Sequence, residues 1–483
     1  MLRTPTDGRA VRGASAWVEV DLDAISHNVR VLRHGLAPGC RLLACVKSDG
    51  YGHGMFRVAR VALQAGADEL VVASVDEGAA LREAGITAPI LIGGPVGAQE
   101  AHAVIQHGLV ASLGAMELAE ALGRATRRRL PVQIEVDTGM HRHGVAAEDL
   151  GAFAASVESR GRLAIAGVYT HLAATGAEDV AALRAQFERF VAAVDAVPAL
   201  RGVRRHACHS LGAMMLPEAH LDAVRIGGAI YGLDPLEQAA GRAALPFAGL
   251  RSALSLKAAV VGLRSAKVGD RVGYGGTFVC ERPTRLALLP IGYGDGLCRE
   301  AWRGAEVLVR GRRAPIVGAI SMNQTTIDVT DLPEIVFGEE VVLLGTMGSE
   351  RVSPADRAAA TGASPYEIVA LLSPRLDRLF RAPQSVASPP SAAQPRSSWS
   401  ETARVPDGAP MPAAPGATLS GADRGSVDRR TVDSRPVDSR SVDTRSVDTR
   451  SVDTRSADRR PSGGGSAAYE RLGSGRSTGS IKR

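Results

Sequence analysis

Aromatic residues and cysteines are scarce in this 483-residue chain. Phe, Trp and Tyr together make up 4% of it, and the five cysteines include no C-x-x-C pair. This argues against a disulfide framework, and scattered cysteines are typical of reduced, cytoplasmic proteins. Because no run of about 18 apolar residues is present, we expect no membrane span. The N-terminal residues contain arginines but lack the apolar run of a signal peptide, so the sequence predicts a cytoplasmic protein.

The predicted folded part of the chain also lacks a large net charge. The whole chain carries +6, but residues 383–483 contain 16 Lys and Arg against 11 Asp and Glu, which leaves +1 for residues 1–382. A near-neutral surface does not attract polyanions, so we expect no nucleic-acid partner. The chain is 45% hydrophobic, which is enough for two domains, since single cores stop growing near about 250–300 residues.

Short apolar runs alternate with amphipathic stretches between residues 41 and 231. Apolar residues at i, i+3 and i+4 predict helices within 23–36, 76–84, 115–128 and 179–194. Alternating strands and helices favour a parallel sheet, and eight strands predict an α/β fold built as a closed (β/α)8 TIM-like barrel. An open doubly wound sheet is less favoured, because no G-x-G-x-x-G follows the first strand. The eight predicted strands are Arg41–Val46, Leu70–Ser74, Pro89–Ile92, Leu109–Leu113, Val132–Val136, Ile165–Thr170, Arg204–Cys208 and Val224–Ile230.

The pattern changes near residue 249. Short strand-like runs separated by Gly and Pro predict a second, mostly β domain, with strands at 285–290, 306–309, 325–329 and 341–344. The chain then becomes low in complexity and repeats a five-residue unit, as in Ser441-Val-Asp-Thr-Arg445, which cannot bury a core. We therefore expect a flexible N-terminus at 1–15, the barrel at 16–248, the β domain at 249–381 and a disordered tail at 382–483.

The first strand delivers Lys47 to the end of the predicted barrel where active sites form. A Gly-rich segment, Ser48–Gly54, follows it directly. Partial burial lowers the pKa of a lysine amine and frees it as a nucleophile, which an aldehyde cofactor requires. Taken alone, a lysine at a strand end is more often a solvated charge on the rim of the barrel.

Polar and glycine-rich segments follow several later strands. The adjacent Gly227 and Gly228 allow backbone N–H groups to approach a phosphate, in the part of the barrel where phosphate sites often form. His206 and Cys208 would share a face of their strand that His209 does not, and we expect no metal site. The polar segments are Asp137–Gly144, Tyr169–His171, Cys208–Ser210 and Arg225–Gly232.

These segments resemble motifs of the alanine racemase family, in the same order along the chain. Val46-Lys47 followed by Tyr51–Gly54 is similar to the cofactor-lysine motif of that family. The resemblance covers roughly residues 16–380 and implies a racemase that depends on pyridoxal phosphate (PLP). It also implies interconversion of L- and D-alanine, with other small amino acids as further substrates, and supply of D-alanine for peptidoglycan. The further matches are Val136–Met140, Thr170-His171, Arg225, Tyr231–Leu233, Gly273–Gly275, Ile291–Gly296, Ser321-Met322 and Tyr366-Glu367.

The resemblance also implies two catalytic bases. Lys47 would hold PLP and serve one face of the substrate, and Tyr274 would serve the other, because racemisation removes a proton from one face and returns one to the opposite face. In the family this tyrosine comes from the partner subunit, which implies a homodimer. His171 would tune Tyr274, and Arg225 would face the pyridine nitrogen and weaken the ring as an electron sink.

Other positions are assigned by the same resemblance. The backbone of Met322, also from the partner subunit, would bind the substrate carboxylate. Arg142 would bind that carboxylate or the phenolic oxygen of the cofactor. The residues implied to hold the phosphate are Tyr51, Ser210, Gly227, Gly228 and Tyr366.

Four positions depart from the family pattern. Glu135 stands where many members have a lysine, often carbamylated, that positions the arginine at 142, and we expect the glutamate to form the same salt bridge. His209 replaces an asparagine, and Asn323 replaces an aspartate beside Met322. Gly228 replaces a larger apolar residue.

Two alternative functions remain. A PLP-dependent decarboxylase of the same architecture usually has a cysteine–aspartate pair and a late Gly-rich, Glu-containing phosphate segment, and we find neither. A non-catalytic PLP-binding protein is typically a lone barrel, whereas the domain at 249–381 contains Tyr274.

Overall fold

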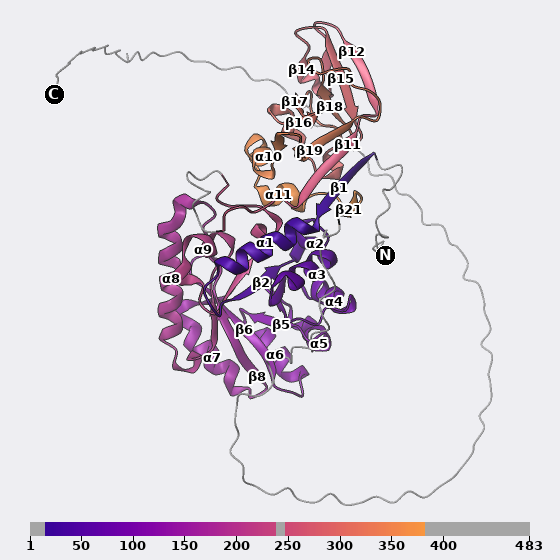
Figure 1. The fold of residues 1–483 in the computed structure, drawn as a ribbon. Helices are drawn as coiled ribbons and strands as arrows, with labels where there is room; N and C mark the ends of the chain where they lie inside the picture. Colours follow the sequence, from indigo (N-terminus) through magenta and orange to yellow (C-terminus); the bar gives the residue numbers. More distant parts are fainter. Residues whose placement is uncertain (1–14, 238–246, 382–483) are drawn as a thin grey trace, which may run out of the picture. The chain divides into compact units, whose positions relative to one another are not determined.

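The computed structural model describes residues 15–237 and 247–381 (Figure 1). The predicted tail at 382–483 and all but the last residue of the predicted flexible N-terminus lie outside the described residues. None of the helices within the described ranges is long and apolar enough to span a membrane.

Eight parallel strands form a closed barrel (Figure 1). Each strand pairs in parallel with a neighbour on either side, and the pairing of the first strand with the last completes the ring. The predicted (β/α)8 barrel is therefore confirmed. The strands are β2 (Arg41–Cys45), β3 (Glu69–Val72), β4 (Ile90–Ile92), β5 (Val110–Leu113), β6 (Leu130–Asp137), β8 (Leu163–Tyr169), β9 (Arg204–His206) and β10 (Ala223–Ile226).

Helices precede the first barrel strand and connect the barrel strands to one another. The four predicted helices are present. The helix predicted at 115–128 ends earlier, at Ala125, because Thr126 has an extended backbone and its hydroxyl donates to the Arg128 carbonyl. Ser74 caps one helix by accepting from the N–H of Glu77 at 3.3 Å. The helices are α1 (Leu22–Gly35), α3 (Met55–Ala65), α4 (Val75–Glu83), α5 (Ala101–Gln106), α6 (Met116–Ala125), α7 (Leu150–Ser159), α8 (Val180–Asp195) and α9 (Ser210–Met215).

The interior of the barrel is divided into an apolar and a polar part. Successive residues of a strand point to opposite sides. One set of strand residues packs against the helices in the main core, and the residues that alternate with it face the barrel interior. On one side of the barrel these form a separate apolar cluster of Leu43, Cys45, Val71, Leu91, Val110 and Ala223. On the other side the alternate positions are buried polar or aromatic residues, namely Gln133, Glu135, Tyr169, His206 and Arg225.

A mostly β domain follows the barrel, as predicted. Its main sheet has the order β17-β16-β19-β11-β1-β21, a second sheet contains β12, β15 and β18, and β13 and β14 form a hairpin. The elements are β11 (Leu254–Ala259), β12 (Gly262–Ala266), β13 (Arg271–Val272), β14 (Phe278–Val279), β15 (Thr284–Leu289), β16 (Glu306–Val309), β17 (Arg312–Pro315), β18 (Thr325–Asp328), β19 (Glu340–Met347), β20 (Glu350–Val352), α10 (Pro354–Thr361), α11 (Pro365–Ala370) and β21 (Asp377–Arg381).

The first described strand belongs to the main sheet of this β domain. β1 (Ala16–Asp21) pairs antiparallel with β11 and parallel with β21, whereas the sequence assigned residues 16–248 to the barrel. Asp21 then starts α1, because its carboxylate accepts from the N–H of Ala24 at 3.0 Å. The beginning and the end of the described chain therefore lie side by side in one sheet.

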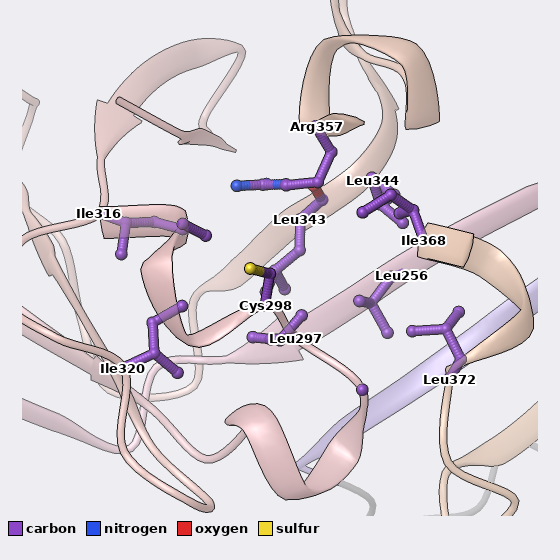
Figure 2. A pocket seen from close by; sticks show the side chains of 12 residues that line it. Leu256, Leu297, Cys298, Ile316, Ile320, Leu343, Leu344, Arg357, Ile368 and Leu372 are labelled. Carbon is purple, nitrogen blue, oxygen red and sulfur yellow. The ribbon is translucent and has the colours of Figure 1, made fainter. Parts of the chain in front are cut away.

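A small cavity of about 20 Å³ lies in the β domain (Figure 2). Leucine and isoleucine side chains line most of it, and Cys298 and Arg357 add polar groups. Arg357 donates to the carbonyls of Glu306 and Leu343, each at 2.8 Å, and burial lowers its pKa to about 10. A volume of this size holds about one water molecule, so the cavity is too small for an amino acid or a cofactor.

Alanine substitutions at two glycines with similar backbone angles can distinguish the cost of backbone strain from the cost of a steric clash. Gly52 and Gly39 have φ of +79° and +81°, but an added Cβ would meet the carbonyl oxygen of Val369 at 2.3 Å only at Gly52. We expect Gly39→Ala to cost about 1 kcal/mol, from the positive φ alone. Gly52→Ala should cost at least about 2 kcal/mol more, since backbone must move. Thermal unfolding of both variants measures the difference, and equal midpoints would contradict this contact.

Candidate active site

Lys47 begins a left-handed turn directly after β2. The turn, labelled α2 (Lys47–Tyr51), has positive φ at three residues other than glycine, with 54° at Ser48, 51° at Asp49 and 53° at Tyr51. Each such residue costs about 1–3 kcal/mol and persists only where the surroundings hold it. Strain of this kind is concentrated at functional sites, which supports a functional role for this turn.

Hydrogen bonds from several elements hold the strained turn. The N–H of Ser48 donates to Glu77 Oε1 of α4 at 2.6 Å, and Asp49 Oδ1 accepts from the N–H of Met55 at 2.8 Å. Arg378 of β21 donates to the Gly52 carbonyl at 2.8 Å. The turn that carries Lys47 is therefore fixed by the barrel and by the β domain together, and Lys47 itself is only partly buried.

Two tyrosines close over the predicted phosphate-binding glycines. A Cβ added to Gly227 would lie 2.4 Å from the Tyr51 hydroxyl, and one added to Gly228 would lie 2.3 Å from Tyr366 Cε1. Burial raises the pKa of both tyrosines, so both hydroxyls stay protonated and can donate. The Ser210 hydroxyl accepts from the N–H of Ala229 at 3.3 Å and so lies beside the same turn. These predicted residues are brought together at one point, and a Cβ at 227 or 228 would require the Tyr51 or Tyr366 side chain to move.

Arg225 lies in the polar part of the barrel interior. Its Nη atoms donate to His206 Nδ1 and to the carbonyls of Thr170 (2.6 Å) and Ala207 (3.1 Å). Its guanidinium lies 4.6 Å from the centroid of the Tyr169 ring. These contacts fix the plane of the guanidinium, while no hydrogen bond to another described residue occupies Nε.

His206 supports Arg225 as a neutral base. Burial lowers the pKa of His206 well below its ordinary value, with Arg225 adding to the effect. Since His206 Nδ1 accepts from Arg225, Nε2 carries the hydrogen and donates to Gln133 Oε1 at 2.7 Å. The positive charge therefore stays on Arg225.

His171 lies among the predicted catalytic and substrate-binding residues. Burial lowers its pKa well below the ordinary value, and the charges of Arg225, His209, Arg142 and Lys47 lower it further. Three of the groups that lower this pKa, namely Arg225, Arg142 and Lys47, belong to the predicted site.

Glu135 does not form the expected salt bridge with Arg142. The carboxylate is 3% exposed, and its Oε2 instead accepts from His143 Nδ1 at 2.8 Å and from the Tyr169 hydroxyl at 2.9 Å. Arg142 is exposed and has no ion pair with any described residue. The Glu135 carboxylate is buried against His143 and Tyr169, whereas the Arg142 side chain is exposed.

Tyr274 and Met322 are exposed on the β domain. Tyr274 follows Gly273 (φ +76°) in the loop between β13 and β14, and it is 70% exposed. Met322 is 57% exposed, and its carbonyl accepts from the N–H of Gly294 at 2.7 Å. Within the described chain, neither residue has a hydrogen bond or ring contact with a barrel residue. The structure therefore does not bring them to Lys47 within one chain.

Two departures from the family pattern have local explanations. His209 caps α9, because its Nδ1 accepts from the N–H of Gly212 at 3.1 Å, and burial lowers its pKa to about 4. Asn323 donates to Asp295 Oδ2 at 3.4 Å. An aspartate at 323 would place a second carboxylate there, so the amide removes a like-charge contact.

Sequence reasoning did not assign roles to Gln133, Tyr169 and His143. Their positions alternate with core residues along β6 and β8 or fall in a loop, and a strand sequence does not reveal that a polar residue faces a barrel interior. His206, which the sequence considered only as a metal ligand, bonds to Arg225. No group of three or more His, Cys, Asp or Glu side chains in the described part of the chain could hold a metal ion.

The geometry fits PLP. The glycine turn under Tyr51 and Tyr366 leaves no space for a Cβ, as expected where backbone must approach a phosphate closely. Lys47 lies at the same end of the barrel, since the carboxyl ends of parallel strands meet at one face. Arg225 lies inside that end and could face a ring nitrogen.

Comparison with known proteins identifies the family. The model of the alanine racemase N-terminal domain matches residues 20–235, and that of the C-terminal domain matches residues 253–380. The alanine racemase of Symbiobacterium thermophilum is 41% identical over 370 residues, which cover 75% of this chain and 96% of that protein. The corresponding protein of Desulfovibrio desulfuricans is 40% identical, with coverage of 75% and 97%.

A solved structure agrees with this match. The alanine racemase from Bacillus anthracis with bound L-Ala-P is 34% identical, with a TM-score of 0.71 and coverage of 77% of this chain and 96% of that one. As the ordered motifs predicted, the chain belongs to the alanine racemase family.

Proposed function

We propose that this protein interconverts L- and D-alanine with PLP, accepts other small amino acids, and supplies D-alanine for peptidoglycan in the cytoplasm. The observation that carries the proposal is the Gly227–Gly228 turn packed under Tyr51 and Tyr366, next to the strained turn of Lys47. The partly buried Tyr366 ring would also narrow this region, which favours a small substrate.

Arg225 and Lys47 would hold the two ends of the cofactor ring system. Bound PLP would withdraw electrons from the substrate's α-carbon and so make its proton removable. Lys47 would provide the covalent attachment. The Nη donors of Arg225 are engaged by His206, Thr170 and Ala207, so its Nε–H remains for the ring nitrogen. Because arginine stays charged, that nitrogen would remain unprotonated, which limits the electron withdrawal.

Lys47 and Tyr274 would act as the two bases. Lys47 would take or return the α-proton on one face, and the partner subunit's Tyr274 would do so on the other. A free phenol has a pKa near 10 and is a weak base. His171, kept neutral by burial and by its cationic neighbours, could bond to that phenol and bring its basicity into range. Arg142 and the Met322 backbone would orient the substrate carboxylate.

The exposure of Tyr274 and Met322 supports a homodimer. Both lie on loops of the β domain and face away from their own chain's core, whereas Lys47 lies at the barrel end. A head-to-tail dimer with two shared sites would bury these residues against the partner's barrel.

Replacing the phenol of Tyr274 tests the two-base assignment. Tyr274→Phe should slow racemisation at least about 100-fold, the usual effect of losing a general acid–base group. Because the two alanine enantiomers have equal free energy, kcat/KM must fall equally in both directions. The asymmetry should appear in deuterium exchange: the variant should exchange the α-hydrogen of one enantiomer only, through Lys47. Unchanged racemisation, or exchange of both enantiomers, would refute the assignment.

Mixing two inactive variants tests the shared site. Lys47→Ala and Tyr274→Ala homodimers should each be inactive. After dissociation and reassociation of an equal mixture, half of the dimers are mixed, and each contains one site with both bases intact, so about a quarter of wild-type activity should return. If both bases came from one chain, each mixed dimer would have no intact site and activity would not return.

The glycine turn predicts a specific loss of cofactor affinity. Gly228→Ala would push a Cβ against Tyr366, so the Kd for PLP should rise at least about tenfold. Gly123 of α6 has nothing within 4 Å of an added Cβ, so Gly123→Ala should leave the Kd unchanged. Absorbance titration of the cofactor-free proteins gives both values. An unchanged Kd for Gly228→Ala would place the phosphate elsewhere.

A further inference from the structure

The buried carboxylate of Glu135 receives two donors on the same oxygen. Oε2 accepts from His143 Nδ1 at 2.8 Å and from the Tyr169 hydroxyl at 2.9 Å, and the Tyr169 hydroxyl also lies 2.7 Å from the Ser112 hydroxyl. Since a carboxylate only accepts, Nδ1 of His143 carries a hydrogen. Hydrogen bonds to an ionised group are about twice as strong as neutral ones.

This bond closes a loop that turns back on β6. Gly144 has φ of +111°, and an added Cβ would lie 2.9 Å from the backbone nitrogen of Asp137 and 3.0 Å from the backbone carbonyl oxygen of Glu135. The chain after the loop then pairs with β6 as the short strand β7 (Val145–Ala146). The side chain of His143 therefore anchors the second half of the loop to Glu135, near the end of β6.

Asp137 anchors the first half of the loop. Its Oδ1 accepts from the backbone N–H groups of Gly139, Met140 and His141 at 2.9, 3.0 and 3.1 Å. Arg142 is the residue between this turn and His143, and no described residue bonds to its side chain. Its placement therefore depends on the two anchors on either side of it.

The imidazole of His143 is also seated against the end of the neighbouring strand. A Cβ added to Gly114, which follows β5, would lie 2.7 Å from His143 Cε1 and Nε2. The ring therefore fills space that no side chain at 114 could share, and its contact with Gly114 fixes it in the direction of Glu135.

We propose that Glu135 and His143 form a positioning pair that holds the loop at residues 138–144, and with it Arg142, in place for the substrate. The proposal rests on the proposed function, in which Arg142 binds the substrate carboxylate. His143 is then a specific contributor to substrate binding, whereas Glu135 also holds Tyr169, whose ring lies under the guanidinium of Arg225 at 4.6 Å.

Substitution of His143 separates positioning from stability. His143→Leu should raise KM for alanine about tenfold, because a displaced Arg142 would weaken its charge-assisted hydrogen bonds to the substrate carboxylate, while kcat changes less than about threefold. The Kd for PLP should stay within about twofold of wild type, because Arg225 and the phosphate-binding residues are not touched. His143→Asn should restore KM, since an amide places an N–H close to the position of Nδ1.

Two control variants are informative. One replaces a histidine outside the loop by leucine, and the other replaces both Glu135 and His143. His102→Leu alters an exposed histidine on α5 and should leave KM unchanged. The double variant Glu135→Leu/His143→Leu removes the buried carboxylate that His143→Leu leaves with the Tyr169 hydroxyl but without its imidazole donor, so its thermal midpoint should lie above that of His143→Leu. Its KM should remain raised. Recovery of KM together with the midpoint would mean that the pair only stabilises the fold, and would overturn the proposal.

Hydrogen exchange of the cofactor-free protein provides a readout that does not depend on activity. Amides of residues 138–142 should exchange about tenfold faster in His143→Leu and at the wild-type rate in His143→Asn. Unchanged exchange or an unchanged KM in His143→Leu would overturn the positioning pair. Absence of alanine racemisation by the wild-type protein would instead overturn the proposed function, and the exchange experiment would still decide whether the pair holds the loop.

Discussion

The closure of β2 against β10 is the constraint on which the site depends. This parallel pairing places the turn of Lys47 beside the Gly227–Gly228 turn, although the two are 180 residues apart in the chain. Glycine at both positions then lets Tyr51 and Tyr366 pack against the backbone. A single register shift in the pairing would reverse which residues face the interior and would remove Arg225 from it.

The site contains a strained backbone turn and buried charged side chains, and both depend on hydrogen bonds from neighbouring residues. The left-handed turn at Ser48–Tyr51 persists because Glu77 accepts from the N–H of Ser48 and Arg378 donates to the carbonyl of Gly52, which follows the turn. Arg225 is buried with carbonyl and imidazole acceptors, and Glu135 provides a buried negative charge on the far side of Tyr169. Such networks are costly when one member is missing, which explains why several polar residues share this half of the barrel.

The departures from the family pattern are connected through their neighbours. A lysine at 135 would need a modification to carry a carboxylate, whereas Glu135 has one. Its shorter side chain meets His143 instead of Arg142, and Asp137 organises the rest of the loop. The substitution at 135 is thus understood only together with the histidine eight residues later.

The sequence alone determined the eight barrel strands, the change to a β domain, and the polar and glycine-rich segments that follow the strands. Those features are encoded locally, because apolar periodicity and glycine pairs express short-range preferences. Only the tertiary structure decided that β1 joins the main sheet of the β domain, that Glu135 pairs with His143, and that Tyr274 and Met322 are exposed on that domain. The pairing of strands, the hydrogen-bond partner of a side chain and the exposure of a residue depend on contacts between segments that are far apart in the chain. A local sequence pattern therefore cannot predict them.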